Sequence, residues 1–290
     1  MKNIIVVKPK GYCAGVKRAI EIAKETKKKY KNNNVYVLGM LVHNQKVIDE
    51  LNLLNIITLL PKNEKDKIDL INKLKAGDVL IFTAHGHDKN LELIAQKKQI
   101  ITIDATCPIV NKNIKKIKEA IKNNKEVLYL GESNHPETNA YLSISDKIQF
   151  IDISLPFIYQ KTTNNEKILI SQTTLNINDL FYIETELKNI DASISSIEEV
   201  CSTTRERQSS VLSIPIDSNI IIIIGDKRSS NSKRLFELAK SSHPSSKCLF
   251  INDKNELRNF NFKNSNDIYL VSGASTPPEL IDDIYNFIKE

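Results

Sequence analysis

The stretch GYCAGVKRAIEIAK, residues 11–24, places a cysteine between a short strand-like run and a helix-like segment. Cys13 is one of four cysteines in a chain of 290 residues. Two others, Cys107 and Cys201, follow it at equal intervals of 94 residues (107 − 13 and 201 − 107). Each of the three comes after a strand-like run and directly before a helix-like segment. The spacing and the shared context together indicate an internal repeat.

The repeat continues downstream of each cysteine. About 24 to 26 residues later comes a strand that ends in glycine and a polar cluster, and further on another strand ends in a second cluster. Strands that alternate with helices in this way indicate α/β units with mostly parallel sheets. We therefore expect a trefoil of three similar α/β domains around a pseudo-threefold axis, with polar strand ends facing a central cavity. The expected domains are residues 14–106, 107–200 and 201–290, and residues 1–13 supply a strand that completes the third domain.

Composition narrows the class of protein. The chain is 41% hydrophobic and 26% charged, as in ordinary globular proteins, and its net charge of +6 suits an anionic ligand. Its lysine–asparagine runs are interpreted as solvated helix faces rather than as a nucleic-acid surface. The N-terminus lacks the apolar core of a signal peptide, and the apolar run at 220–224 is too short to span a bilayer. We expect a cytoplasmic protein with reduced cysteines and no membrane contact.

Three repeated cysteines suggest a metal site. A thiol at a helix N-terminus favours the thiolate that binds metals. Three thiolates could hold zinc with a histidine as fourth ligand, or an iron–sulfur cluster with one iron left open. Any one of them alone could instead be a buried small apolar residue, but their equal spacing favours ligands. Cys248 lies in a probable strand without a polar cluster and is interpreted as structural.

At these residues the sequence resembles the 4-hydroxy-3-methylbut-2-enyl diphosphate reductase family, iron–sulfur oxidoreductases that end the non-mevalonate route of isoprenoid biosynthesis. The resemblance covers almost the whole chain, and its motifs are GYCAGVKRAI, VHN, AHG, DATCPIV, HPE, SQTTL, the VC of EEVCSTTRERQ, SSNS and GAS. It implies one [4Fe–4S] cluster per chain, with one iron not ligated by protein. It also implies a trefoil of α/β domains and a central diphosphate pocket.

The resemblance assigns roles residue by residue. Cys13, Cys107 and Cys201 would ligate the cluster, Glu137 would be the proton source, and Thr173 would lie beside the reacting end. Arg205 and Arg207 are interpreted as surface or inter-helix residues. The substrate, chiefly its diphosphate, would contact His43, His85, His135, Thr174, Ser229, Ser230, Asn231 and Ser275.

Several residues depart from the usual pattern of the family. Relatives usually carry glycine at the position of Asn134, and often serine and asparagine where Asp226 and Arg228 stand. An acidic Asp226 beside a diphosphate pocket is unfavourable unless Arg228 or a lysine pairs with it. The other departures are Glu132, Asn139, Ala140, Glu198, Glu199 and Val200.

The implied reaction removes the terminal hydroxyl of the substrate as water after two single-electron transfers through the cluster. An allyl intermediate is then protonated to isopentenyl or dimethylallyl diphosphate. Ferredoxin or flavodoxin would supply the electrons, and the family suggests a monomer. Two alternatives stay open: a hydro-lyase that uses the open iron only as a Lewis acid, and a zinc-stabilised nucleic-acid-binding protein. No basic patch interleaved with aromatic residues supports the second.

Overall fold

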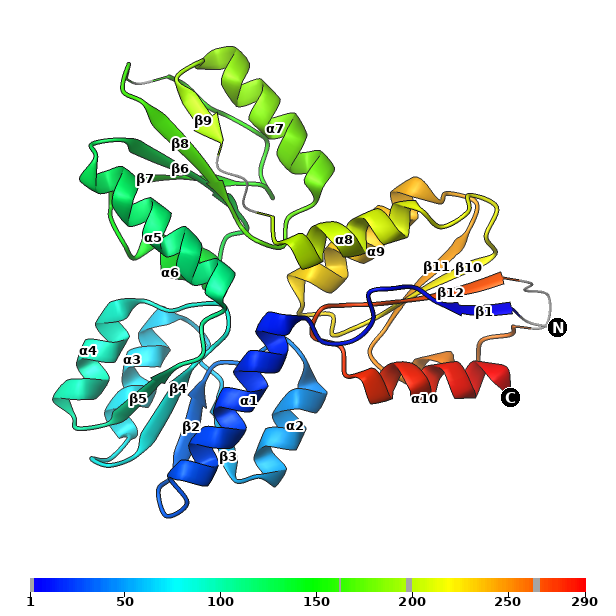
Figure 1. Cartoon of the computed structure of the whole chain (residues 1–290), viewed down its shortest axis with the longest axis horizontal. Helices are drawn as coiled ribbons and strands as arrows, with labels where there is room; N and C mark the ends of the chain where they lie inside the picture. Colours follow the sequence, from blue (N-terminus) through cyan, green and yellow to red (C-terminus); the bar gives the residue numbers. More distant parts are fainter. Residues whose placement is uncertain (1–2, 162, 197–199, 263–266) are drawn as a thin grey trace. The chain divides into compact units, whose positions relative to one another are not determined.

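A computed structural model describes residues 3–161, 163–196, 200–262 and 267–290 (Figure 1). Its chain divides into two compact units. The first unit contains Met1–Val16, His43–Val47 and Cys201–Glu290, and the second contains Lys17–Val42 and Ile48–Val200. The described strands form three four-stranded sheets, in which every neighbouring pair is parallel.

Two of these sheets belong to the second unit. Their strand orders are β3-β2-β4-β5 and β7-β6-β8-β9, so the same order occurs twice. The strands are β2 (Val35–Leu38), β3 (Ile56–Leu59), β4 (Val79–Phe82), β5 (Ile101–Asp104), β6 (Glu126–Gly131), β7 (Ile148–Asp152), β8 (Lys167–Ser171) and β9 (Ile194–Ser196). The helices that alternate with them are α1 (Ala14–Lys29), α2 (Gln45–Leu53), α3 (Glu64–Lys73), α4 (Lys89–Lys97), α5 (Pro108–Lys122), α6 (Pro136–Leu142) and α7 (Ile177–Ile190).

The third sheet belongs to the first unit and repeats this order a third time, as β11-β10-β12-β1. Its outer strand comes from the N-terminus, because Asn3 pairs in register with Asp267. The strands are β1 (Asn3–Val6), β10 (Ile220–Ile224), β11 (Lys247–Ile251) and β12 (Asp267–Ser272). The helices are α8 (Ser202–Leu212), α9 (Ser230–Ser242), the 3₁₀ helix η1 (Lys254–Leu257) and α10 (Pro278–Lys289).

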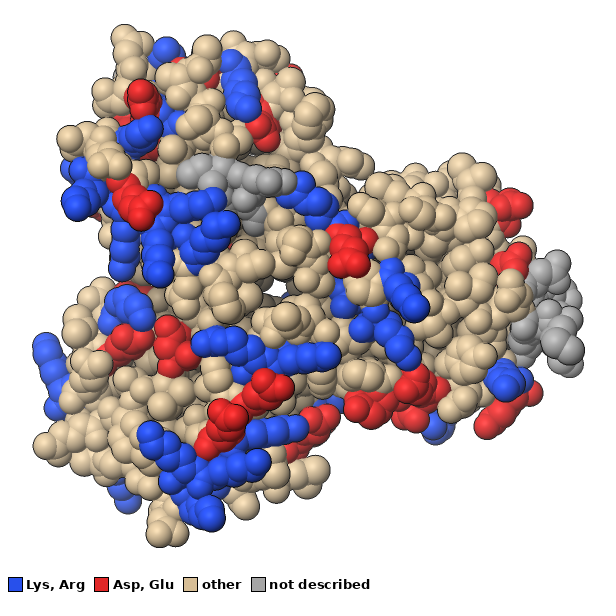
Figure 2. All heavy atoms as spheres, in the orientation of Figure 1, with Lys and Arg blue, Asp and Glu red and all other residues tan. Residues whose placement is uncertain are grey.

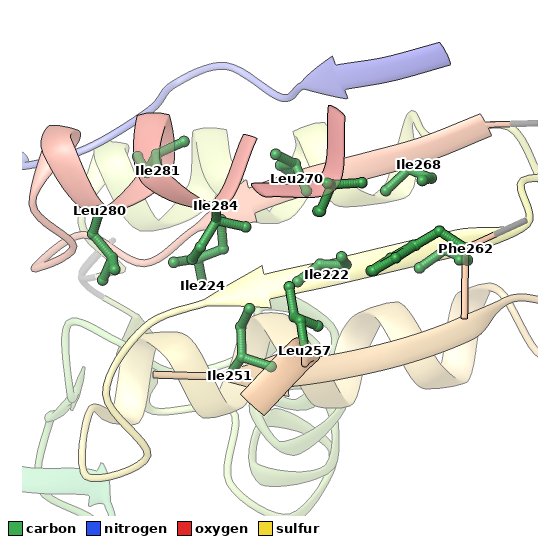
Figure 3. Packing of buried hydrophobic residues seen from close by; sticks show 12 residues of the cluster. Ile222, Ile224, Ile251, Leu257, Phe262, Ile268, Leu270, Leu280, Ile281 and Ile284 are labelled. Carbon is green, nitrogen blue, oxygen red and sulfur yellow. The ribbon is translucent and has the colours of Figure 1, made fainter. Parts of the chain in front are cut away.

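The isoleucine run of β10 is buried on both faces of its sheet. Ile222 and Ile224 pack into a cluster that includes Ile284 of α10 (Figure 3). Ile221 and Ile223 join another cluster, which contains residues of α8 and α9. A parallel sheet covered on both faces requires such a continuous apolar strand, and each buried isoleucine contributes about 1.5–3 kcal/mol.

The lysine-rich runs form exposed helix faces, as predicted. On α5, Val110, Ile117 and Ala120 are buried, whereas the lysines lie on the other side. Figure 2 shows Lys and Arg side chains gathered over α5 and over the C-terminal end of α1. In the part of the chain that the structure describes, no helix has the length and apolarity needed to cross a membrane.

The shared strand order confirms the predicted repeat of three α/β domains with parallel sheets. Cys13, Cys107 and Cys201 follow the equivalent outer strands β1, β5 and β9. The two central strands of each sheet also end in polar clusters, at the position where strand order reverses and open α/β sheets bind ligands. The exact domain boundaries and the pseudo-threefold axis stay predictions.

Candidate functional site

Each of the three repeated cysteines lies at the start of a helix. Cys107 and Cys201 are the N-cap residues of α5 and α8, and Cys13 directly precedes α1. The Sγ of Cys13 accepts the backbone N–H of Val16 at 3.4 Å. All three side chains are partly exposed and none forms a disulfide. The positive end of a helix favours a thiolate, so these positions suit metal ligation.

The loops after neighbouring strands hold two of these cysteines by equivalent backbone hydrogen bonds. The N–H of Cys13 donates to the carbonyl of Ala274 after β12, and that of Cys107 donates to the carbonyl of Ala84 after β4, both at 2.9 Å. Cys248 differs, because it lies within β11 and burial raises the pKa of its thiol. Its surroundings therefore disfavour the thiolate.

The donor chemistry fits an iron–sulfur cluster, since soft thiolates are its usual ligands. Cys13 and Cys201 belong to the first unit and Cys107 to the second. Within either unit taken by itself, no three His, Cys, Asp or Glu side chains of the described residues lie close enough together to hold a metal ion.

In the first unit, the Ser229–Asn231 segment forms the N-terminus of α9. Ser229 caps this helix and accepts the N–H of Ser232 at 3.4 Å. Asn231 is 5% exposed, and its Oδ1 accepts the N–H of Ala274 at 2.9 Å. Its buried Nδ2 has no hydrogen-bond partner among the described residues. A helix N-terminus with an additional buried donor is suited to an anion.

Close packing explains why glycines surround this helix end. Gly225 follows β10 and Gly273 follows β12, and a Cβ atom on either would collide with the Oγ of Ser232. The first turn of α9 therefore lies directly against the ends of two central strands. The same unit holds Ser275, whose hydroxyl donates to the carbonyl of His43 at 3.0 Å. Ser275, His43 and the start of α9 are thus linked through the loop at residues 273–276.

In the second unit, Glu137 and Thr173 form a buried pair. Glu137 lies in the first turn of α6 and is 1% exposed. Its Oε1 accepts the backbone N–H of Thr173 at 2.9 Å, and its Oε2 accepts the Thr173 hydroxyl at 2.8 Å. A carboxyl held at both oxygens has a fixed direction, which a proton donor requires.

Two predicted histidines lie together near this carboxyl. His135 caps α6, and its Nδ1 accepts the N–H of Glu137 at 3.2 Å. This bond leaves the proton of the neutral ring on Nε2. The rings of His85 and His135 meet edge to face, with centroids 5.5 Å apart. The second unit therefore brings together His85, His135, Glu137 and Thr173. The Thr174 hydroxyl accepts a hydrogen bond from the side-chain amide of Gln172 at 2.8 Å.

Two buried tyrosines lie in the same region. The pKa values of Tyr129 and Tyr141 are raised well above the ordinary value, by burial first and then by the negative charge of Glu137. Both side chains are fully buried. The Glu137 carboxyl therefore lies in surroundings that contain little water.

The departures from the family pattern have local explanations. Asn134 has a φ of 61°, a left-handed conformation that glycine adopts freely and asparagine tolerates. Glu132 donates its N–H to the buried Gln172 at 2.9 Å. Ala140 is 2% exposed within α6. Glu198 and Glu199 lie outside the described residues.

The sequence predicts that Arg207 is a surface or inter-helix residue, and the surface role is wrong. Its side chain is 2% exposed and donates to backbone carbonyls that lie far away in the sequence. Sequence reasoning missed it because α8 has polar residues all round, and such a helix looks solvent-exposed. Gln172 and Ser232, both fully buried, were also missed.

Comparisons with known proteins show the family of this chain. Residues 4–289 match the family model described as LytB protein. Curated proteins named 4-hydroxy-3-methylbut-2-enyl diphosphate reductase are similar over the whole chain. The protein from Malacoplasma penetrans is 32% identical over 99% of this chain and 97% of its own length, and that from Wolbachia pipientis subsp. Culex pipiens is 33% identical over 99% and 92%.

Two solved structures have the same architecture. The E-1-hydroxy-2-methyl-but-2-enyl-4-diphosphate reductase from Plasmodium falciparum has a TM-score of 0.88 and 29% identity, over 100% of this chain and 88% of that one. A structure of (E)-4-hydroxy-3-methyl-but-2-enyl diphosphate reductase, described as the terminal enzyme of the non-mevalonate pathway, has a TM-score of 0.66 and 27% identity. It matches over 100% of this chain and 99% of its own.

Proposed function

The chain belongs to the LytB family of 4-hydroxy-3-methylbut-2-enyl diphosphate reductases, and on that premise we propose how its own residues perform this reaction. The family, the oxidoreductase class and the non-mevalonate route agree with the prediction from sequence. The roles of individual residues, the cluster type and the electron donor are our proposals.

Cys13, Cys107 and Cys201 hold a [4Fe–4S] cluster in this proposal. Their equivalent positions after β1, β5 and β9, each at a helix start, support it. When bound, a cluster on three thiolates supplies electrons one at a time and leaves one iron open for the substrate hydroxyl. Cys248 has no part in it.

The diphosphate is bound by donors at strand ends and at a helix N-terminus. In the first unit these are His43, Ser275 and the Ser229–Asn231 segment. The buried Nδ2 of Asn231 has no acceptor among the described residues and could donate to the diphosphate. In the second unit they are His85, His135 and Thr174. Hydrogen bonds to an anion are about twice as strong as neutral ones, so several such donors suffice for tight binding.

The buried Glu137–Thr173 pair is the observation that carries the proposed chemistry. The Thr173 hydroxyl lies 2.8 Å from Glu137 Oε2 and donates to it. When Oε2 is protonated this bond reverses, so that Oε2 donates its proton to Thr173 Oγ1 while the Thr173 hydroxyl gives its own proton to the departing hydroxyl. The backbone N–H of Thr173 on Oε1 keeps the carboxyl in place. Burial keeps bulk water away, which protects the carbon centre from side reactions.

The overall reaction consumes two electrons and two protons. One C–O bond breaks, the hydroxyl leaves as water with one proton, and a C–H bond forms with the other. A reduced ferredoxin or flavodoxin supplies the electrons, and the lysines of α5 would attract such acidic carriers. The enzyme would work as a monomer in the cytoplasm, where thiols stay reduced.

Metal analysis of anaerobically purified protein, together with its absorption spectrum, tests this proposal. We expect iron and sulfide in equal amounts, and substrate turnover only when a chemical electron donor is added. Zinc in place of iron would contradict the cluster. Loss of water from the substrate without any donor would favour the hydro-lyase alternative.

A further inference from the structure

Arg207 connects three segments of the first unit that lie far apart in the sequence. It lies on α8, six residues after Cys201 (207 − 201). Its Nη1 donates to the carbonyl of Pro9 at 2.9 Å, and to the carbonyl and, at 3.2 Å, the hydroxyl of Ser272. Its Nη2 donates to the carbonyl of Gly11. The planar guanidinium thus joins the loop before Cys13, the end of β12 and the helix after Cys201.

The Ser272 hydroxyl completes this connection. It also accepts the N–H of Gly11 at 3.0 Å, so Gly11 is held through both its N–H and its carbonyl. Cys13, two residues later, bonds through its N–H to Ala274. The path of the chain into Cys13 therefore depends on Arg207 and on the loop after β12.

Within the described ranges, the Arg207 guanidinium donates only to neutral acceptors and forms no hydrogen bond to a carboxylate. Its Nε is buried and lacks a partner there as well. Burial lowers the pKa of Arg207, and the negative charges of Cys13 and Glu206 oppose that effect. A buried cation without a hydrogen-bonded carboxylate is costly, and the thiolate of Cys13 adds a counter-charge when the site is loaded.

We propose that Arg207 is a positioning residue that sets the geometry between Cys13 and Cys201 and supplies a buried positive charge to the iron–sulfur cluster. This inference rests on the proposed function. A nearby positive charge stabilises the more negative, reduced cluster, and local charge is one of the factors that set cluster potentials. Arg207 therefore makes the cluster easier to reduce.

Three variants separate the charge from the geometry. Arg207→Gln removes the charge and most of the hydrogen bonds, so we expect less iron and sulfide per chain and a more negative midpoint potential. Arg207→Lys keeps the charge but cannot reach three segments at once, so it should lose iron while its midpoint potential stays closer to that of the wild type. Arg258→Gln, at an exposed position of the same unit, controls for the loss of one positive charge.

Iron and sulfide content and a redox titration followed by electron paramagnetic resonance provide the readouts. Wild-type cluster content and potential in Arg207→Gln would overturn the inference. If Arg207→Gln does not fold, Arg207→Lys decides. A full content of iron and sulfide in Arg207→Lys would refute the positioning role. A midpoint potential far more negative than that of the wild type in Arg207→Lys would refute the role of the positive charge. A wild-type protein without iron would instead refute the proposed function itself.

Discussion

Arg228 forms a two-point ion pair with Asp226, from Nε to Oδ1 at 2.9 Å and from Nη2 to Oδ2 at 2.6 Å. Asp226 also accepts the backbone N–H of Gln45 at 2.9 Å, where α2 begins. Burial alone would raise the pKa of Asp226, but the hydrogen bonds from Arg228 and Gln45 hold it below its usual value. Asp226 and Arg228 both depart from the family pattern, and the positive charge of Arg228 neutralises the negative charge of Asp226.

This pairing predicts opposite effects of the two single substitutions. Arg228→Asn leaves a carboxylate three residues before the capping Ser229, so pyrophosphate binding should weaken by about three- to tenfold, the size of an interaction of roughly 1 kcal/mol. Asp226→Ser removes the carboxylate that neutralises the Arg228 guanidinium and should strengthen binding. The double variant should return close to the wild type. Calorimetric titration with pyrophosphate measures all four proteins, and single substitutions that change the affinity in the same direction would contradict the prediction.

The cysteines provide a second prediction. Cys13→Ser, Cys107→Ser and Cys201→Ser should each fail to keep a complete cluster after anaerobic reconstitution with iron and sulfide. Cys248→Ser is the matched control, because its thiol lies in a strand and not at a helix start. It should give the spectrum of the wild type. A complete cluster in Cys201→Ser, or none in Cys248→Ser, would refute the assignment.

Asn231 tests the anion site independently of the cluster. Asn231→Ala removes the buried Nδ2 donor and also the bond from Ala274 to Oδ1. Since a hydrogen bond to a charged group contributes about 1.5–3 kcal/mol, affinity for substrate and for pyrophosphate should fall by roughly 10- to 100-fold. The cluster spectrum should not change. Asn231→Asp keeps the shape and adds a negative charge, and it should bind even more weakly.

The fold was largely predictable because its signals are local. The helix-like segments predicted directly after Cys13 and Cys201 are helices, at Ala14–Lys29 and Ser202–Leu212. The isoleucine run of β10 is typical of a strand that is covered on both faces. Pro108 stands at the first position of α5, where its missing N–H costs nothing.

Contacts between distant segments could not be predicted in the same way. The burial of Arg207 depends on carbonyls of Pro9, Gly11 and Ser272, which no local pattern connects to α8. The pairing of Asp226 with Gln45 likewise needs the tertiary fold. Motif resemblance indicated Glu137 and Thr173 separately, and only the structure shows the two hydrogen bonds between them.

His87 predicts a pH dependence of stability in the second unit. It stacks on Phe82, and its Nε2 lies 2.6 Å from Glu92 Oε1. Burial lowers the pKa of His87. The hydrogen bond to Glu92 and the negative charge of Asp104 raise this pKa only in part, and the positive charge of Lys89 lowers it further. The unfolded chain therefore binds a proton that the folded chain rejects, so stability is complete above the unfolded pKa of about 6.5 and falls as pH drops below it.

Unfolding midpoints in denaturant at pH 7.5 and 5.5 measure this effect. His87→Gln keeps a polar group near Glu92 but cannot titrate, so its midpoint should change less between the two pH values. An equally large change in the variant would assign the effect to other groups.

Glu137 provides the sharpest test of reduction as opposed to binding alone. Hydroxide is a poor leaving group without a proton, and general acid catalysis typically contributes about 10²- to 10⁴-fold. Glu137→Gln keeps an oxygen that can accept the N–H of Thr173, but it has no proton to deliver. The variant should hold its cluster, bind pyrophosphate as the wild type does, and turn over 10²- to 10⁴-fold more slowly with a chemical electron donor.

Thr173→Ser and Thr173→Val separate the two parts of the proposed relay. Serine keeps the hydroxyl that donates to Oε2, whereas valine has nearly the same shape and lacks it. Activity should persist in the first variant and fall in the second, because the proton passes through that hydroxyl. Wild-type turnover in Glu137→Gln would exclude this carboxyl as the acid. Loss of the cluster in the same variant would instead make Glu137 a structural residue, since its proton would not explain the defect.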